Sequence, residues 1–194
     1  MSDNSPVIKA ISQRRSPRVF LERSVEPGKL LSLFEAARLA PSSNNEQPWR
    51  FIVAIKDDIG AYGDLLNCLR PGNRAWAHTA PVLLLVLSRK TYEKTGVNNR
   101  HAWHDVGLSV GILSVQATAL GLALHQIGGI IPEEAKNRFG IPDEFDVVTA
   151  IALGYEGDPS ALPADLQAKE GRSRTRKPLN EIIFSGYFGK QSAP

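Results

Sequence analysis

Cysteine is almost absent from this chain of 194 residues, because Cys68 is its only one. A single cysteine excludes an internal disulfide and a cysteine-rich metal site, and it fits a reducing compartment. Long hydrophobic runs are missing too. The longest, Pro81–Leu87, is too short to cross a bilayer, and the N-terminus MSDNSPVIKA lacks the apolar core of a signal peptide. We therefore expect a cytoplasmic protein that is neither secreted nor inserted in a membrane.

The motifs of several common enzyme classes are also missing. No G-x-G-x-x-G follows an expected strand, which argues against a Rossmann dinucleotide site, and there is no P-loop and no G-x-S-x-G nucleophile elbow. His101, His104 and Asp105 have helical spacing, but no H-E-x-x-H surrounds them. A partly exposed helix explains them better than a metal site. We assign no metal ligand and no catalytic acid, base or nucleophile.

What the chain does contain is enough apolar sequence for a core, 42% of its residues, in patterns that alternate between helix and strand. No repeat, low-complexity tract or domain boundary interrupts them. The sequence therefore predicts one α/β or α+β domain over residues 1–194. The expected helices run from Pro6, with Ser5 as N-cap, to about Arg14, and over about 27–40, 58–69, 98–120 and 132–139. Gly140 closes the last of them, and a turn is expected at Pro71-Gly72. The expected strands cover 49–55, 81–87 and 146–153.

The longest helical pattern, about Asn98 to Leu120, has two stripes and a capping glycine, Gly121. One stripe is apolar. The other consists of small residues, which let another helix approach closely. The partner of that small stripe is either an element of the same chain or a second subunit. The residues of the small stripe are Gly107, Gly111, Ser114 and Thr118.

The C-terminal part begins with a polar connection over about 161–171, followed by a basic and extended stretch, Arg172–Pro178. An apolar tail follows, with Ile182-Ile183-Phe184 and Tyr187-Phe188. This tail is too apolar to stay loose. We expect it to dock on its own subunit or on another.

Positive charge gathers near both ends of the chain, although the net charge is only +3. Two arginine clusters can bind nucleic acid, or they can hold one small anion from both ends of the chain. The run Arg14–Arg18 can equally be a solvated charge run at the end of a helix. Only Phe20 lies near the first cluster and no aromatic residue lies within the second, which argues against a nucleic-acid binder. The clusters are Arg14, Arg15, Arg18 and Arg23, and Arg172, Arg174, Arg176 and Lys177.

Two further stretches offer polar groups and bare backbone. Ala40–Phe51 places serines, asparagines and a glutamine between a helix and a strand, and Gly128-Gly129 follows a short apolar segment. Each is either an ordinary turn or part of a ligand site. Loops rich in hydroxyls, amides and guanidiniums, without an evident catalytic group, suit a protein whose chemistry resides in a bound cofactor.

These segments, in this order and spacing, resemble the FMN-dependent nitroreductase family over about residues 8–189. The matching segments are Arg14–Arg18, Ala40–Trp49, Gly121–Gly129, Ala152–Tyr155 and Arg174–Leu179. The resemblance implies an α+β fold with a mainly antiparallel or mixed central sheet flanked by helices. It also implies a homodimer that exchanges its C-terminal segments and binds one FMN in each of two sites at the subunit interface.

The resemblance also assigns the residues of the site. Arg14, Ser16, Arg174 and Arg176, with Arg15 beside them, match positions that hold the FMN phosphate. Arg18 matches a basic residue at the pyrimidine edge of the flavin. Pro41, Ser42, Ser43 and Asn45 match residues that reach the flavin from the other subunit, and Gln126, Gly128 and Gly129 match the segment at the flavin N5 edge. Many family members have an acidic residue where this chain has Gly128, so only a backbone role carries over.

The implied activity is that of an NAD(P)H oxidoreductase with ping-pong turnover. NADH or NADPH would deliver hydride to flavin N5, and a nitroaromatic, quinone or similar acceptor would then take its place. Arg18 would stabilise the negative charge of the reduced flavin. Reductive dehalogenation, an oxygen-dependent oxidation and flavin binding without turnover are the alternatives.

Overall fold

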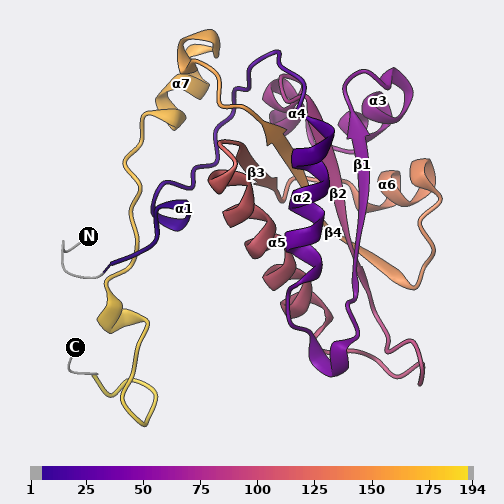
Figure 1. Cartoon of the computed structure of the whole chain (residues 1–194), viewed down its shortest axis with the longest axis vertical. Helices are drawn as coiled ribbons and strands as arrows, with labels where there is room; N and C mark the ends of the chain where they lie inside the picture. Colours follow the sequence, from indigo (N-terminus) through magenta and orange to yellow (C-terminus); the bar gives the residue numbers. More distant parts are fainter. Residues whose placement is uncertain (1–5, 192–194) are drawn as a thin grey trace.

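The structure, a computed structural model, describes residues 6–191 of the chain. Within them a four-stranded antiparallel sheet has the order β1-β2-β4-β3 (Figure 1). Its strands are β1 (Trp49–Ile55), β2 (Val82–Arg89), β3 (Ala123–Ile127) and β4 (Phe145–Gly154). The three predicted strands are confirmed, and so is the α+β fold with a mainly antiparallel sheet. The predicted N-cap, Ser5, lies outside the described residues.

The central strands β2 and β4 divide the interior into two cores. All of β2 from Val82 to Ser88 is buried, as an apolar run covered on both faces predicts. Successive side chains point to opposite faces of the sheet. Leu83 and Leu85 therefore join one core, and Leu84 and Val86 join the other.

Helices cover both faces of this sheet. On one face, α2 (Pro27–Arg38) and α5 (Ala102–Ala119) bury Leu33, Ala37 and Leu113 against it. On the other face, α3 (Ile59–Asn67), α4 (Pro71–Ala77) and α6 (Pro132–Phe139) contribute Leu65, Trp76 and Ala135. Figure 1 shows α2 and α5 side by side in front of the strands.

Helix ends follow local chemistry. Gly121 follows α5 with φ +74°, and the N–H of Leu122 donates to the carbonyl of Ala117 at 2.8 Å. This is the pairing of a Schellman motif, and glycine adopts its left-handed conformation without steric cost. Gly140 ends α6 in the same conformation, with φ +60°. Both predicted stops are confirmed.

Three segments differ from the sequence-based expectations. The first helix, α1, is only Lys9–Ser12. Pro71-Gly72, expected as a turn, begins α4, because proline fits the first position of a helix. The expected polar connection contains α7 (Ala164–Glu170), whose single buried side chain, Leu166, gives too weak a periodicity to reveal a helix.

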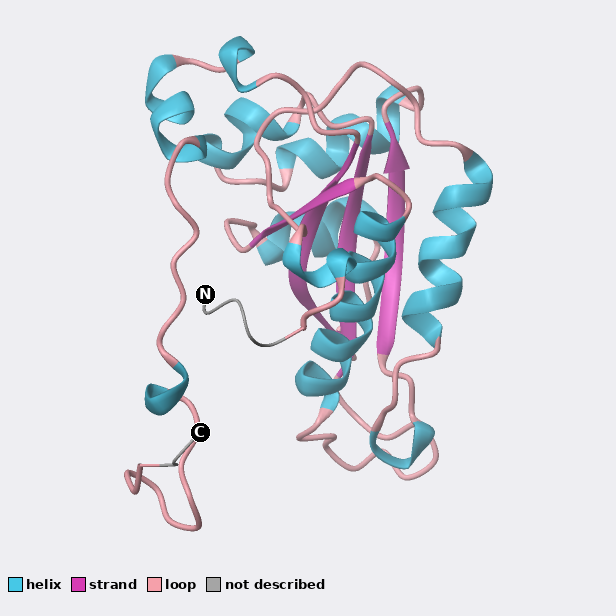
Figure 2. Cartoon of the chain, turned by 60° about the vertical axis from the view of Figure 1, so that its left-hand side comes forward, coloured by secondary structure: helices cyan, strands magenta, loops and turns pink. Residues whose placement is uncertain are grey.

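Beyond α7 the chain runs beside the body as an extended segment, and Figures 1 and 2 both show it standing apart from the sheet and its helices. It contains one short helical turn, Leu179–Glu181, and a local contact between the rings of Phe184 and Phe188 at 4.8 Å. Its apolar side chains are exposed, Tyr187 by 78% and Phe188 by 94%. The tail thus does not dock on its own subunit.

Among residues 6–191, none of the helices has the length and apolarity that crossing a membrane would require.

Candidate functional site

The two arginine clusters meet in space. Arg174 Nη1 donates a hydrogen bond to the carbonyl of Ser12 at 2.9 Å, which ties the C-terminal segment to the end of α1. Arg14 Nη1 donates to Ser16 Oγ at 2.9 Å and to the carbonyl of Arg15 at 3.1 Å. Burial, and then the charges of Arg174 and Arg176, lower the pKa of Arg14. Two segments that lie some 160 residues apart in the sequence therefore form one centre of positive charge.

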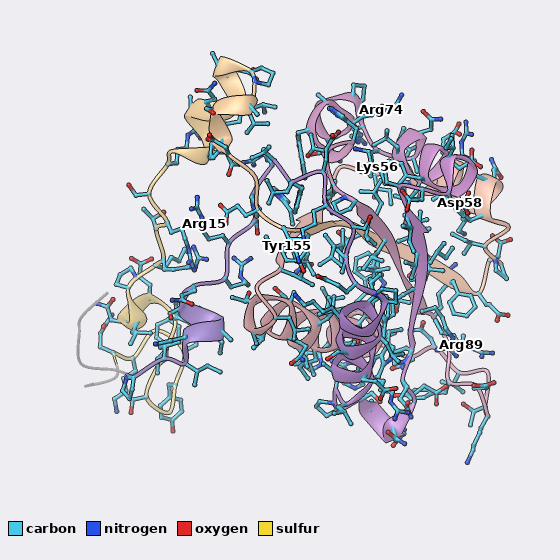
Figure 3. All side chains as sticks on the ribbon, turned by 45° about the horizontal axis from the view of Figure 1, so that its top comes forward. Arg15, Lys56, Asp58, Arg74, Arg89 and Tyr155 are labelled. Atoms are coloured by element: carbon cyan, nitrogen blue, oxygen red, sulfur yellow. The ribbon has the colours of Figure 1, made fainter. Side chains whose placement is uncertain are left out.

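No carboxylate of residues 6–191 forms an ion pair with the centre of this cluster. In the described part of the chain, Arg14, Arg174 and Arg176 form no ion pair, whereas the neighbouring Arg15 pairs with Glu156 at 3.4 Å. Figure 3 shows Arg15 on the N-terminal loop, facing the C-terminal segment. Three guanidiniums that lie close together, with no counter-charge paired to them among residues 6–191, are suited to bind a multiply charged anion.

Arg18 lies on the same loop but is differently placed. Its Nη1 donates to Glu170 Oε1 at 2.9 Å, and the Glu170 side chain is only 5% exposed. His125 of β3 lies beside the pair, with its Nδ1 at 2.9 Å from the carbonyl of Pro17. Burial lowers the pKa of His125. An acceptor at Nδ1 requires the proton of the neutral ring on that nitrogen.

The end of β3 presents bare backbone. Gly128 is exposed, and no atom lies within 4 Å of where its Cβ would stand. At Gly129 a Cβ would come within 1.9 Å of Asn73 Nδ2, which donates to the Gly129 carbonyl at 3.2 Å. The side chain of Gln126 is exposed next to them. Asn73 thus fixes the backbone at Gly129, and Gly128 leaves room for a ligand above it.

The loop after α2 is held in an unusual conformation. Asn44, Asn45 and Gln47 have φ of 54°, 55° and 50°, a region that non-glycine residues rarely adopt. Hydrogen bonds fix the loop from within and from outside. Ser42 Oγ accepts from the N–H of Gln47 at 3.0 Å, and the N–H of Ser43 donates to Asp105 Oδ2 at 2.9 Å.

Hollows border this loop on two sides. One, of about 330 Å³, is lined in part by Pro41, Ser42 and His104. A larger one, of about 890 Å³, is lined in part by Asn45 and Tyr92. Strained backbone with open space beside it is typical of a ligand-contacting loop.

The predicted site residues thus form two groups. Arg14–Arg18 and Arg174–Arg176 lie at one place, and β3, which leads to Gly128-Gly129, meets this group where His125 bonds to the carbonyl of Pro17. No hydrogen bond or ion pair among residues 6–191 joins these segments to the loop Pro41–Asn45. Within one chain the loop is not part of the arginine centre.

Sequence reasoning missed three residues that shape these groups. Asn73, Glu170 and Asp105 contact predicted site residues from 56, 152 and 62 positions away in sequence. Asn73 and Glu170 belong to no recognisable local motif, and the helical spacing of Asp105 with the two histidines did not indicate that it would bond to Ser43. His104 does form a hydrogen bond with Asp105, at 3.1 Å, but its ring is exposed. Throughout residues 6–191, no three His, Cys, Asp or Glu side chains are grouped so as to hold a metal ion.

Comparison with known proteins adds three kinds of likeness. A family model described as the nitroreductase family matches residues 11–155. A solved structure of an oxidoreductase containing FMN is 35% identical, with a TM-score of 0.90, covering 98% of this chain and 96% of that one. A candidate nitroreductase in complex with FMN from Desulfovibrio desulfuricans is 28% identical, with a TM-score of 0.72, covering 95% and 98%. The FMN reductase [NAD(P)H] of Bacillus subtilis is 25% identical over 80% of this chain and 68% of its own length.

Proposed function

Because the chain belongs to the nitroreductase family, we propose that it is an FMN-dependent oxidoreductase that takes electrons from NADH or NADPH. The observation that carries the proposal is the meeting of Arg14, Arg174 and Arg176, which form no ion pair with any carboxylate of residues 6–191. FMN-containing relatives and an NAD(P)H-dependent relative support it. The acceptor class we propose is a nitroaromatic, a quinone or a similar electron-poor compound.

The residues present fit the phosphate of FMN. A phosphate monoester carries close to two negative charges near neutral pH and several acceptor oxygens. Arginine can bind such a group with two parallel hydrogen bonds, which lysine cannot do. We assign the phosphate to Arg14, Ser16, Arg174 and Arg176, with Arg15 at the margin.

The remaining predicted residues would orient the flavin ring. Gly128 and Gly129 offer exposed backbone, with Asn73 holding it in place and Gln126 beside it. Arg18 would lie at the pyrimidine edge, where a fixed cation favours the more negative, reduced form of the flavin. Bound FMN would supply the hydride chemistry itself, and the protein would supply position, charge and exclusion of water.

We further propose that the complete site needs two subunits. Pro41, Ser42, Ser43 and Asn45 would reach the FMN whose phosphate is held by the other subunit. The two glycines of the small stripe of α5 support this, whereas its Ser114 is buried within the same chain. Gly107 and Gly111 are exposed, with nothing within 4 Å of where their Cβ atoms would stand, and Trp103 on the same helix is 55% exposed. A face with small and apolar residues open to solvent is suited to a second copy of the chain.

The C-terminal tail would dock on that second copy. The tail extends away from the rest of its own subunit with its apolar side chains exposed. One surface elsewhere on the molecule is suited to receive it. Among the described residues, no strand pairs with the outer edge of β1, where Val53 and Ile55 are 38% and 43% exposed. An apolar hollow of about 360 Å³ lies there, lined in part by Phe34 and Phe51. An open strand edge beside an apolar hollow can accept an extended segment.

The phosphate assignment is tested by Arg176→Ala. We expect the purified protein to be yellow, to bleach when mixed anaerobically with NADH or NADPH, and to lose FMN much more readily in the variant. Two or three lost charge-assisted hydrogen bonds, at roughly 1.5–3 kcal/mol each, predict at least a tenfold weaker FMN affinity. The thermal midpoint of the apo protein should change little, because Arg176 is exposed.

Arg172→Ala is the matched control, since Arg172 lies exposed on the same segment but is not among the charges that lower the pKa of Arg14. Equal FMN affinity in Arg176→Ala and Arg172→Ala would contradict the assignment. A colourless protein that takes up no added FMN would refute the proposed function as a whole.

A further inference from the structure

Glu170 is a buried carboxylate whose charged partner is Arg18. It is the last residue of α7, its side chain is 5% exposed, and Oε1 lies 2.9 Å from Arg18 Nη1. A buried charge is unfavourable unless it is paired and hydrogen-bonded. Glu170 and Arg18 therefore hold each other in place, and α7 brings a negative charge to the Arg14–Arg18 loop from 152 residues away.

His125 packs beside this pair without adding charge. Its ring stacks on Trp76 with the centroids 4.5 Å apart, and its Nδ1 bonds to the carbonyl of Pro17. Burial, with a smaller contribution from the charge of Arg18, lowers the pKa of His125 below its usual 6.5. Because burial favours the neutral ring, the charges that matter here are those of Arg18 and Glu170.

Arg18 keeps donors available for a ligand. Among residues 6–191, its one side-chain hydrogen bond is the one from Nη1 to Glu170, which leaves Nε and Nη2 without a protein acceptor. Its side chain is 29% exposed, although that of Glu170 is buried. The pair therefore presents a cation at the surface, with its counter-charge behind it.

We propose that Glu170 is a positioning residue of the flavin site, which fixes the Arg18 guanidinium and partly offsets its charge. This inference rests on the proposed function, in which Arg18 lies at the pyrimidine edge of FMN. Two-electron reduction makes the flavin more negative, so a nearby cation favours the reduced form. A cation that is paired with a buried carboxylate favours the reduced form less strongly, because the carboxylate offsets part of its charge. Glu170 thereby sets the site to release electrons to an acceptor more readily than an unpaired Arg18 would.

The test is Glu170→Gln, which retains an oxygen that can accept from Arg18 and removes the negative charge. The readout is the midpoint potential of bound FMN, titrated anaerobically against reference dyes, together with the dissociation constant of oxidised FMN. We expect the preference for reduced over oxidised FMN to rise on the order of tenfold. For a two-electron couple, tenfold corresponds to a potential about 30 mV more positive.

Asp165→Asn is the matched control. Asp165 lies on the same helix, and the substitution removes the same charge from a 72% exposed side chain, which lies 3.8 Å from Lys169. The midpoint potential of FMN bound to Asp165→Asn should equal that of FMN bound to the wild type. An unchanged potential in Glu170→Gln overturns the inference, and so does an equal shift in both variants, because that shift would be a general effect of charge.

A second pair of variants applies if Glu170→Gln fails to fold. Arg18→Lys with Glu170→Gln keeps a cation beside a neutral amide, and the midpoint potential of its bound FMN should be more positive than that of Arg18→Lys alone, in which the lysine can still pair with Glu170. Equal potentials in these two proteins overturn the role of Glu170. The proposed function is tested separately. It fails if the wild type binds no FMN. It stands if FMN binds but its midpoint potential does not depend on residue 170.

Discussion

Gly128 and Gly129 are neighbours in the chain but differ in what a side chain would meet there. The space around Gly128 is open within 4 Å of an added Cβ, whereas a Cβ on Gly129 would collide with the Asn73 amide. That amide also bonds to the Gly129 carbonyl. Gly129 is therefore required by close packing, and Gly128 is not.

We expect Gly129→Ala to destabilise the protein by about 1 kcal/mol, because Asn73 must move and give up its hydrogen bond. Gly128→Ala should change the free energy of unfolding by less than about 0.5 kcal/mol. Urea unfolding of the apo proteins measures both.

A double-mutant cycle identifies the cause of the Gly129 effect. In an Asn73→Ala background the obstructing amide is gone, so Gly129→Ala should lose most of its effect. Fully additive effects of the two substitutions would show that Asn73 is not what makes alanine unfavourable at Gly129.

At the scale of elements, Tyr155 joins three of them. Its hydroxyl donates to Glu26 Oε2 before α2 and accepts from Lys29 Nζ of that helix at 2.8 Å. Lys29 Nζ also donates to the carbonyl of Leu120, at the end of α5, at 3.3 Å. Tyr155 itself follows β4. The network thus links the start of α2, the end of α5 and the end of β4.

This network predicts a pH dependence of stability. The hydrogen bond from Tyr155, with smaller contributions from the backbone, Arg23 and Lys29, lowers the pKa of Glu26 from 4.5 to about 2. A carboxyl group whose pKa is lower when folded contributes stability above its unfolded pKa and loses it as the pH falls. We expect the wild type to lose stability between about pH 4.5 and pH 2 more steeply than Glu26→Gln, measured as urea midpoints at several pH values.

Tyr155→Phe should make stability depend less on pH between about pH 4.5 and pH 2, because it removes the largest cause of the lowered pKa of Glu26. Glu35→Gln is the control, since Glu35 lies on α2 and its one side-chain partner among residues 6–191 is the exposed Arg38. Identical pH profiles for the wild type and Glu26→Gln would show that the network does not hold Glu26 ionised.

At the scale of the whole molecule, three features are explained by the same proposed dimer. They are the exposed tail, the exposed face of α5, and the separation of the loop Pro41–Asn45 from the arginine centre. If the loop Pro41–Asn45 serves the partner's FMN, a monomer has no complete site. If the tail anchors the dimer, removing its apolar side chains affects assembly and cofactor binding together.

We therefore predict that replacing Ile182, Ile183 and Phe188 by serine yields a monomer with at least tenfold weaker FMN retention. The reason is the loss of buried apolar area, at about 25 cal/mol per Å², on docking. Sedimentation equilibrium gives the oligomeric state, and flavin absorbance after gel filtration gives retention.

Lys190→Ser is the control, because it alters the same tail without removing an apolar side chain. A dimer that persists in the triple variant would contradict docking of the tail on the partner. A monomer that retains FMN as tightly as the wild type would contradict a site shared between subunits.

The sequence alone determined most of the secondary structure and the kind of chemistry. The run Pro81–Leu87 predicted a strand covered on both faces, and Gly121 and Gly140 predicted helix ends, because periodicity and capping depend on residues close in sequence. The ordered arginine, serine and glycine segments indicated the family. Short helices such as α4 and α7 were not predicted, since one or two buried side chains do not produce a detectable helical period.

Only the tertiary structure decided which distant residues meet. It brought Arg174 to the end of α1, Glu170 to Arg18 and Asn73 to Gly129. It also separated the loop Pro41–Asn45 from the arginine centre within one chain. Such contacts depend on the path of the whole chain around the sheet, and no local pattern encodes that path. The physical reason is that burial and charge pairing act between surfaces that meet only after the chain has folded.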